Sequence, residues 1–212
     1  MRPSRNILLS VAAASLALQC SCGDNAAAWT SLFNGSDLAG WSGDPSVWRA
    51  EPGYITGKSQ AVARNTHLIY AGEFSDFELQ AKVMVLNAGS FPNSGIFYRA
   101  QITDAAAWQI NGYQSDVGIN YWGSLYEDAR GELVAPLPAA QAVARDGDWN
   151  DYRIVAQGNS LRHEINGVTA VDFVDSDPQQ RRTGVIALQY HQPGEGFEVR
   201  YTDIQIRELS SE

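Results

Sequence analysis

Short segments in which apolar and polar residues alternate are the feature that most constrains how this 212-residue chain can fold. Between residues 77 and 85 the odd positions are Phe, Leu, Ala, Val and Val, and the positions between them are mostly polar. Residues 152–156 repeat this pattern, and Asn166-Gly167 separates 161–165 from 168–173 as the dipeptide of a tight hairpin turn would. Two more such segments cover 184–191 and 197–208. The alternation predicts short antiparallel strands, each with one buried face.

Helical patterns are nearly missing from the same sequence. Only residues 139–145, in a loop that begins with Pro136 and Pro138, suit a short helical turn. No internal repeat indicates a propeller or a solenoid. Many short strands without helical interludes predict an all-β fold, a two-sheet antiparallel jelly-roll sandwich that occupies residues 29–212 as one domain.

The first 28 residues are expected to direct export rather than to join the fold. Arg2 and Arg5 precede an apolar stretch over 7–18, which is too short to span a bilayer but suits a cleaved signal. Either Cys20 or Cys22, directly behind it, could be the acylated cysteine of a lipoprotein, although Gln19 fits the usual consensus poorly for both. We expect an exported periplasmic or cell-envelope protein, anchored through one of these cysteines and tethered by the residues up to 28.

Other interpretations of this segment remain open. A disulfide between the two cysteines is disfavoured because one residue separates them. The cysteines could also be idle thiols, and the three alanines at 26–28 offer an ordinary cleavage site.

Composition excludes several classes of function. The formal net charge of −9, without a basic patch, argues against nucleic acid or an anionic membrane as partner, so membrane contact is expected only through the lipid. The folded part lacks cysteine, which excludes a thiol nucleophile and a cysteine-based zinc site. G-x-S-x-G, H-E-x-x-H and a phosphate-binding glycine loop are also missing. Asp172, Asp175 and Asp177 are more typical of a solvated turn than of a calcium site.

In three segments, alternation along the strand places polar residues on one face and mostly apolar residues on the other. The polar sets are Arg99 and Gln101 opposite Ile96, Tyr98 and Ala100; Gln114 and Asp116 opposite Tyr113, Ser115 and Val117; and Gln189 and His191 opposite Ile186, Leu188 and Tyr190. If the apolar sets face the core, the polar sets project from outer sheet faces. A curved sheet could collect them in one concave groove, or they could be unconnected residues facing solvent.

Aromatic residues follow Asp116 closely in the sequence. Trp122 and Tyr126 lie beside glycines and next to Glu127. Aromatic faces near carboxylates and amides suit a sugar, whose C–H face stacks while its hydroxyl groups form hydrogen bonds. The alternative is that both rings only close the edge of the sandwich.

The chain has three histidines with different surroundings. His67 stands among apolar residues, and His163 shares the parity of Leu161 and Ile165, so both are expected to be structural. His191 has polar neighbours at a strand end and is the best candidate for acid–base chemistry.

Ordered motifs along nearly the whole chain after Trp29 resemble the 3-keto-disaccharide hydrolase family. They are LFNGSDLAGW (32–41), FSDFEL (74–79), NSGIFYR (93–99), GYQSD (112–116), YWGSLYE (121–127), WNDY (149–152), NG (166–167) and LQYH (188–191). The resemblance implies a concanavalin A-like jelly roll. It also implies cleavage of 3-keto-glucosides or 3-keto-disaccharides, as a hydrolase or as a lyase coupled to hydration of the 2-hydroxyglucal.

Such chemistry needs a base near C2, donors or a cation at the C3 oxygen, and an acid for the leaving group. The resemblance assigns Arg99 to enediolate stabilisation, and His191 and Asp116 to the proton transfers. Glu127 is an alternative base. The residues expected to position the sugar are Gln114, Gln189, Trp122 and Tyr126. No cofactor is required, although His191, Asp116 and Glu127 could together hold a divalent metal ion.

Two other functions remain open at this stage. A non-catalytic, lectin-like carbohydrate-binding module would need the aromatic rings but no acid–base group, and fold alone does not decide between binding and catalysis. A structural or adhesive domain would have a blocked or apolar groove.

Overall fold

The computed structural model describes residues 27–59, 62–86, 92–191 and 196–210 and consists of two antiparallel sheets packed face to face. The first sheet contains, in spatial order, β13 (Val168–Val174), β12 (Ser160–Ile165), β11 (Asn150–Gln157), β6 (Phe77–Leu86), β15 (Glu198–Glu208), β4 (Tyr54–Lys58) and β3 (Trp48–Glu51), with β1 (Thr30–Ser31) paired to β15. The second contains β10 (Gly131–Val134), β9 (Leu125–Glu127), β8 (Gln109–Val117), β7 (Ser94–Asp104), β14 (Gly184–Tyr190), β5 (Thr66–Phe74) and β2 (Trp41–Ser42). The predicted all-β sandwich is confirmed.

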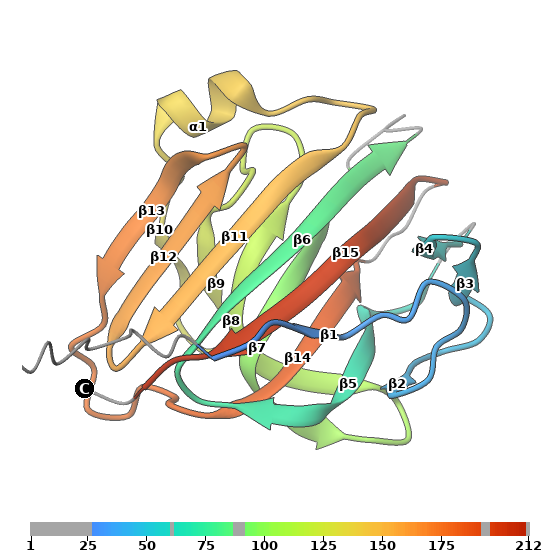
Figure 1. Cartoon of the computed structure of the whole chain (residues 1–212), viewed down its shortest axis with the longest axis horizontal. Coiled ribbons are helices and arrows are strands. Elements are labelled where there is room, and N and C mark those ends of the chain that lie inside the picture. Colours follow the sequence, from blue (N-terminus) through green and yellow to red (C-terminus); the bar gives the residue numbers. More distant parts are fainter. Residues whose placement is uncertain (1–26, 60–61, 87–91, 192–195, 211–212) are drawn as a thin grey trace, which may run out of the picture.

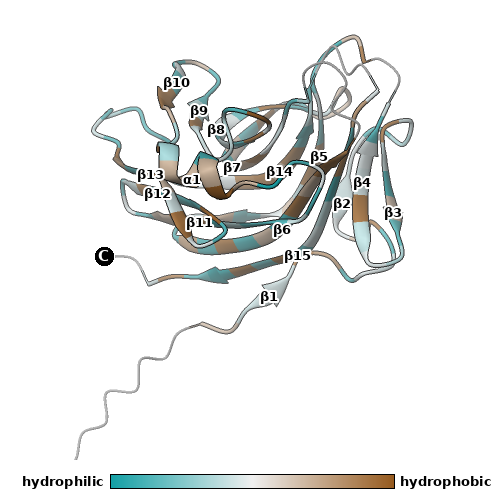
Figure 2. Cartoon of the chain, turned by 90° about the horizontal axis from the view of Figure 1, so that it is seen from above, coloured by the Kyte–Doolittle hydropathy of each residue, from teal (hydrophilic) through white to brown (hydrophobic). Residues whose placement is uncertain are grey.

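Figure 1 shows the strands of the two sheets, and Figure 2, turned by 90°, shows the sheets as two layers. In Figure 2 the ribbons from β10 to β5 follow an arc whose hollow side faces away from the first sheet. The helix α1 (Pro138–Val143) lies beside β13, in the loop where the sequence predicts a helical turn. No helix among the described residues is long and apolar enough to cross a membrane. The expected export signal and both cysteines lie outside the described residues.

The core between the sheets contains the apolar sets that strand parity predicts. On β6 these are Phe77, Leu79, Ala81, Val83 and Val85, and on β14 they are Ile186, Leu188 and Tyr190. The opposite parity of β14, Val185 and Ala187, joins a second, smaller apolar cluster on the hollow face. Burial of apolar area contributes roughly 25 cal/mol per Å² of surface removed from water, so this alternation fixes the register of the strands.

A β-bulge at Arg99 interrupts the parity of β7. The pairing of β7 with β8 shifts between Tyr98 and Gln101, and Arg99 has a backbone φ of +47°. Gly184 of β14 packs directly against the bulge, where a Cβ atom would meet the carbonyl oxygen of Ala100. Because a bulge inserts one extra residue, Ala100 points to the hollow face with the smaller cluster instead of to the core.

The Arg99 side chain is fully buried and joins the two layers. Its Nε donates to the carbonyl oxygen of Ser75 at 2.8 Å, and its Nη1 donates to that of Gly158 at 2.9 Å. Its Nη2 forms an ion pair with Asp76 Oδ1 at 2.9 Å, and the same oxygen accepts from the Gly158 backbone N–H. These partners lie at the ends of β6 and β11 in the first sheet, so the guanidinium of a second-sheet residue holds the sheets together at one end of the sandwich.

Beyond the bulge, the β7–β8 hairpin folds across the hollow face towards β5 and β2. Its last residue before β8, Trp108, packs on the smaller apolar cluster, which includes Phe97 and Ile69. The Trp108 carbonyl oxygen lies 2.8 Å from His67 Nδ1 on β5, and the indole Nε1 lies 3.4 Å from Ser42 Oγ on β2. The hairpin therefore covers one part of the hollow face and leaves the other part open.

We predict that Arg99→Met lowers the free energy of unfolding by about 3–5 kcal/mol, because it breaks the ion pair of a fully buried guanidinium and leaves the partly buried Asp76 carboxylate without its partner. Arg162→Met is the matched control, since that arginine is 44% exposed in its pair with Glu164 and its loss should cost no more than about 0.5 kcal/mol. Urea unfolding followed by tryptophan fluorescence measures both. Equal effects of the two substitutions would show that the Arg99 network does not hold the sheets together.

Candidate functional site

A groove of about 320 Å³ opens on the hollow face of the second sheet. Its floor comes from β8 and β14, one wall from β9 and β10, and its rim from the segments that precede β5 and β7. The lining residues are Asn65, Asn93, Gln114, Asp116, Tyr121, Tyr126, Asp128, Glu132, Gln189 and His191. The groove thus combines carboxyl groups, amides, two tyrosines and one imidazole.

The floor is a chain of hydrogen bonds that crosses three strands. Gln114 Nε2 donates to Asp116 Oδ1 at 2.6 Å and to Gln189 Oε1 at 3.2 Å. Gly95 of β7 pairs with Asp116 on one side and with Gln189 on the other. A Cβ atom at Gly95 would overlap the Gln114 side chain, so the glycine allows this amide to lie flat between its two partners.

Asp116 is the most strongly perturbed carboxyl group of the groove. Burial raises its pKa to about 7, with a further rise from the nearby charge of Glu132, while the hydrogen bond from Ser124 Oγ opposes the shift. Its backbone is also fixed, since its carbonyl oxygen accepts from Tyr152 OH at 2.8 Å and from Gly123 N at 2.8 Å. A carboxyl group that titrates near neutral pH and is held in place can take up and release a proton.

Negative charge dominates the described lining. Asp128 accepts from the Gly112 backbone N–H at 3.0 Å, and partial burial raises the pKa of Asp128. Glu132 on β10 stands next to Tyr126, its partner across the strands. No lysine or arginine is among the described residues that line the groove. The arrangement therefore favours a neutral or cationic ligand over an anionic one.

His191 and Tyr126 complete the set of sequence-predicted residues that reach the groove. His191 directly follows β14, and its backbone N–H donates to the Asn93 carbonyl oxygen at 3.2 Å. Tyr126 faces the same side as Gln114, its partner across the strands. The structure thus brings together Gln114, Asp116, Tyr126, Gln189 and His191, and their catalytic and binding roles stay predictions.

The expectation that Arg99 lies in this groove is wrong. The bulge reverses its parity, and its guanidinium points to the ends of β6 and β11 instead. Alternation counted from Ile96 cannot reveal this reversal, because the extra residue leaves no mark in the apolar pattern.

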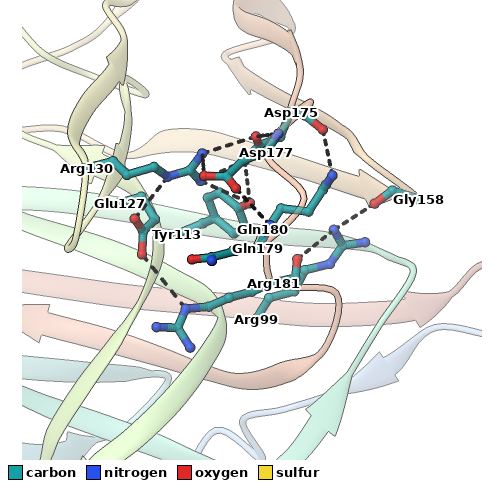
Figure 3. Close-up of polar contacts among 10 residues, drawn as sticks. All are labelled: Arg99, Tyr113, Glu127, Arg130, Gly158, Asp175, Asp177, Gln179, Gln180 and Arg181. Carbon is teal, nitrogen blue, oxygen red and sulfur yellow. Dashed lines mark hydrogen bonds and ion pairs between the residues drawn. The ribbon is translucent and has the colours of Figure 1, made fainter.

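Glu127 also lies outside the groove, contrary to expectation. It follows Tyr126 on β9 and points to the other side, where it pairs with Tyr113 across the strands. Figure 3 shows its carboxylate between Arg130 and Arg181, with Nε–O distances of 3.2 Å and 3.8 Å. Arg130 in turn binds Asp175 at 2.7 Å, so Glu127 belongs to an ion-pair cluster rather than to an acid–base pair with Asp116.

Trp122 is the third residue placed elsewhere. It is 2% exposed in the main core and packs near Tyr152. Its backbone is clamped by Gln141 of α1, whose amide bonds both the N–H and the carbonyl oxygen. The ring therefore packs in the core between the sheets instead of facing the groove.

A metal ion shared by His191, Asp116 and Glu127 is incompatible with the position of Glu127. In the described part of the chain no three histidine, cysteine, aspartate or glutamate side chains come together as ligands.

The other two histidines are structural, as expected. His163 is fully buried between Tyr98 OH at 2.9 Å and the Gly123 carbonyl oxygen at 2.9 Å, and burial lowers its pKa to about 4. Burial lowers the pKa of His67 to about 4 as well. Both rings are therefore neutral at ordinary pH.

Sequence reasoning missed half of the lining. Asn65, Asn93 and Tyr121 come from loops, and Asp128 and Glu132 flank a sharp turn, where neither parity nor periodicity applies. The spacing of Asp128 and Glu132 after the strand that carries Tyr126 is the one signal that could have suggested a hairpin over the groove.

Comparison with solved structures agrees with the architecture. Two provisionally named glycosyl hydrolases from Parabacteroides distasonis ATCC 8503 superpose with TM-scores of 0.65 and 0.64 at 19% and 21% identity, covering 86% of this chain and 94% and 100% of theirs. The carbohydrate-binding module CBM66 from Bacillus subtilis has a TM-score of 0.60 at 14% identity, over 82% of this chain and 98% of that one. At such identities the likeness concerns the fold. A search of curated proteins found no match.

The sequence itself matches one family model, described as the 3-keto-alpha-glucoside-1,2-lyase-like domain, over residues 28–207. That range includes every strand of both sheets, except for the last residue of β15, and every described residue of the groove. The chain therefore belongs to the 3-keto-alpha-glucoside-1,2-lyase-like domain family.

Proposed function

We propose that this protein is an exported carbohydrate-active enzyme that cleaves 3-keto-glucosides in the groove around Asp116. The observation that carries the proposal is a fixed carboxyl group with a pKa of about 7 on the floor of a polar groove, in a chain of this family. Family membership supports a carbohydrate-related function, and the groove supplies groups for the chemistry.

A ketone at C3 makes the C2 proton acidic, so the first step is its removal by a base. Asp116 in its ionised form takes this proton, and the electron pair of the C2–H bond moves towards the C3 oxygen to give an enediolate. Because the pKa of Asp116 is near neutrality, the carboxylate is both available and a stronger base than an ordinary aspartate.

The second step breaks the bond between C1 and the aglycone oxygen. The enediolate re-forms the C3 ketone, a C1–C2 double bond forms, and the aglycone leaves with a proton that His191 donates. Addition of water across the double bond would then give the free 3-keto sugar, and the overall result is hydrolysis. His191 suits this role because it lines the same groove and because an imidazole can both donate and accept a proton.

Because Arg99 lies elsewhere, the neutral amide of Gln189 takes its proposed role as the donor to the C3 oxygen. Gln189 Oε1 accepts from Gln114, so the Nε2 donors of Gln189 remain for the substrate. Asn93 Oδ1 is buried and has no partner among the described residues, so a sugar hydroxyl group can donate to it. Tyr126 offers an aromatic face for the C–H side of the ring.

The proposed export of the protein is based on residues 1–28. The basic start, the apolar stretch and the two cysteines behind it support a lipid-anchored protein of the periplasm or cell envelope. Globomycin treatment or metabolic labelling with an alkyne fatty acid tests the anchor, and Cys20→Ala and Cys22→Ala identify the acylated residue.

Asp116 should titrate near pH 7 in the folded protein, against about 3.9 in the unfolded chain. The folded state then holds this proton more tightly, so the contribution of Asp116 to the free energy of unfolding falls as pH rises between about 4 and 7. Asp116→Asn removes that contribution and should gain stability relative to wild type as the pH is raised. Carboxyl ¹³C NMR gives the titration, and urea unfolding at both ends of the range gives the stability. A wild-type-to-variant difference that is independent of pH would contradict the raised pKa.

Turnover of methyl 3-keto-α-glucoside and 3-keto-trehalose, followed by mass spectrometry, tests the activity. Asp116→Asn and His191→Ala should each lower kcat/KM by about 10²-fold or more, the usual scale for loss of a general base or acid. Asp151→Asn, an exposed aspartate on the first sheet, is the matched control and should keep the wild-type rate. Glycan binding without turnover of any ketosugar would show that the protein is a carbohydrate-binding module and not an enzyme.

Glu132→Gln should move the pH profile without removing a catalytic group. The charge of Glu132 raises the pKa of Asp116, so its loss lowers that pKa and moves the acidic limb of kcat/KM to lower pH. Glu51→Gln on β3, outside the groove, is the control and should leave the limb in place. An unmoved limb in Glu132→Gln would mean that Asp116 is not the base.

A further inference from the structure

A second pocket of about 330 Å³ lies beside the groove in the direction of β5 and β2. It is formed by the loop after β2, the segment before β5 and the tip of the β7–β8 hairpin. The residues that matter here are Asp44, Ser46, Ser59, Arg64, Thr66 and Trp108. The strand order in this part of the sheet is β8–β7–β14–β5–β2. The groove lies over β8 to β14, and the second pocket lies next to it, by β5 and β2.

One short segment separates the two pockets. Asn65 lines the groove, while its neighbours Arg64 and Thr66 line the second pocket. Gln109 Nε2, on the hairpin, donates to the Asn65 carbonyl oxygen at 2.8 Å and ties this segment to the hairpin. Only the start of β5 lies between the two pockets, and neighbouring strands are about 4.8 Å apart. A ligand bound in one pocket can therefore reach across β5 into the other.

The chemistry of the second pocket is that of a site for hydroxyl groups. It offers a carboxylate, a guanidinium and hydroxyl groups beside the Trp108 ring. Asp44, Ser46 and Arg64 supply these groups from the loop after β2 and from the segment before β5.

Trp108 is held in this pocket in a strained conformation. Its φ of +49° is rare for a bulky residue and costs on the order of 1–3 kcal/mol. His67, neutral because burial lowers its pKa, donates from Nδ1 to the Trp108 carbonyl oxygen at 2.8 Å. This bond and the packing on the smaller apolar cluster fix the half-buried indole at the edge of the pocket.

We propose that this pocket is the subsite for a second sugar ring, the aglycone of a 3-keto-disaccharide, with Trp108 stacking on that ring and Arg64 binding its hydroxyl groups. The inference rests on the proposed function, because it assumes that the 3-keto ring binds in the groove around Asp116. The leaving ring then binds in the second pocket. A disaccharide would therefore contact Trp108, whereas a glucoside of a small alcohol would not.

The test compares two substrates that differ only in the second ring. In Trp108→Ala and Arg64→Ala, the ratio of kcat/KM for 3-keto-trehalose to that for methyl 3-keto-α-glucoside should fall, by about tenfold for Trp108→Ala. The ratio cancels any loss of folded protein. Trp149→Ala, a similarly half-buried tryptophan outside both pockets, is the control and should keep the wild-type ratio. Unchanged ratios in Trp108→Ala and Arg64→Ala, with turnover intact, would overturn the subsite and leave the proposed function standing.

Binding of unreactive sugars separates the two proposals. Trehalose should shift the indole N–H resonance of Trp108, assigned through Trp108→Phe, more than methyl α-glucoside does. That result without turnover of any ketosugar would support the subsite and refute the proposed cleavage. Equal shifts from both sugars, or none from either, would refute the subsite.

Discussion

The fully buried guanidinium of Arg99 is the contact on which the shape of this sandwich depends. It links the second sheet to Asp76 and to the carbonyl groups of Ser75 and Gly158 in the first. The same residue forms the bulge that bends the β7–β8 hairpin across the hollow face. A charge in this position needs all of its partners, because an unpaired buried ion would cost several kcal/mol. The network therefore fixes the bulge, and through it the part of the hollow face that stays open.

The groove illustrates how a fold can retain an unfavourable group where chemistry needs it. Burial and the neighbouring charge of Glu132 both disfavour the ionised form of Asp116, and the donors to its carboxylate, Ser124 and Gln114, are uncharged. Full pairing with an arginine, as Asp175 has with Arg130, lowers the pKa of that carboxyl to about 2 and would make it useless as a base. The position of the arginines in ion-pair clusters away from the groove thus matters as much as the residues within it.

The sequence predicted the regular parts of the site and missed those that depend on irregular backbone. Gln114 and Asp116 were placed correctly because β8 alternates without interruption there, opposite Tyr113 and Val117 in the core. Arg99 was misplaced because a bulge reverses parity without changing the apolar pattern. Glu127 and Trp122 lie elsewhere for a different reason, because closeness to Asp116 in the sequence does not ensure closeness in space.

By itself the sequence determined the all-β class, the hairpin at Asn166-Gly167 and the inward faces of β6, β8 and β14. These follow from local chemistry, because side chains alternate along a strand and water drives the apolar set inward. Only the tertiary structure decided which polar residues meet. The bulge at Arg99, the cross-strand alignment of Asp116, Gly95 and Gln189, and the return of Trp108 to β5 join residues far apart in the chain. Their energies depend on long-range packing, which no local pattern encodes.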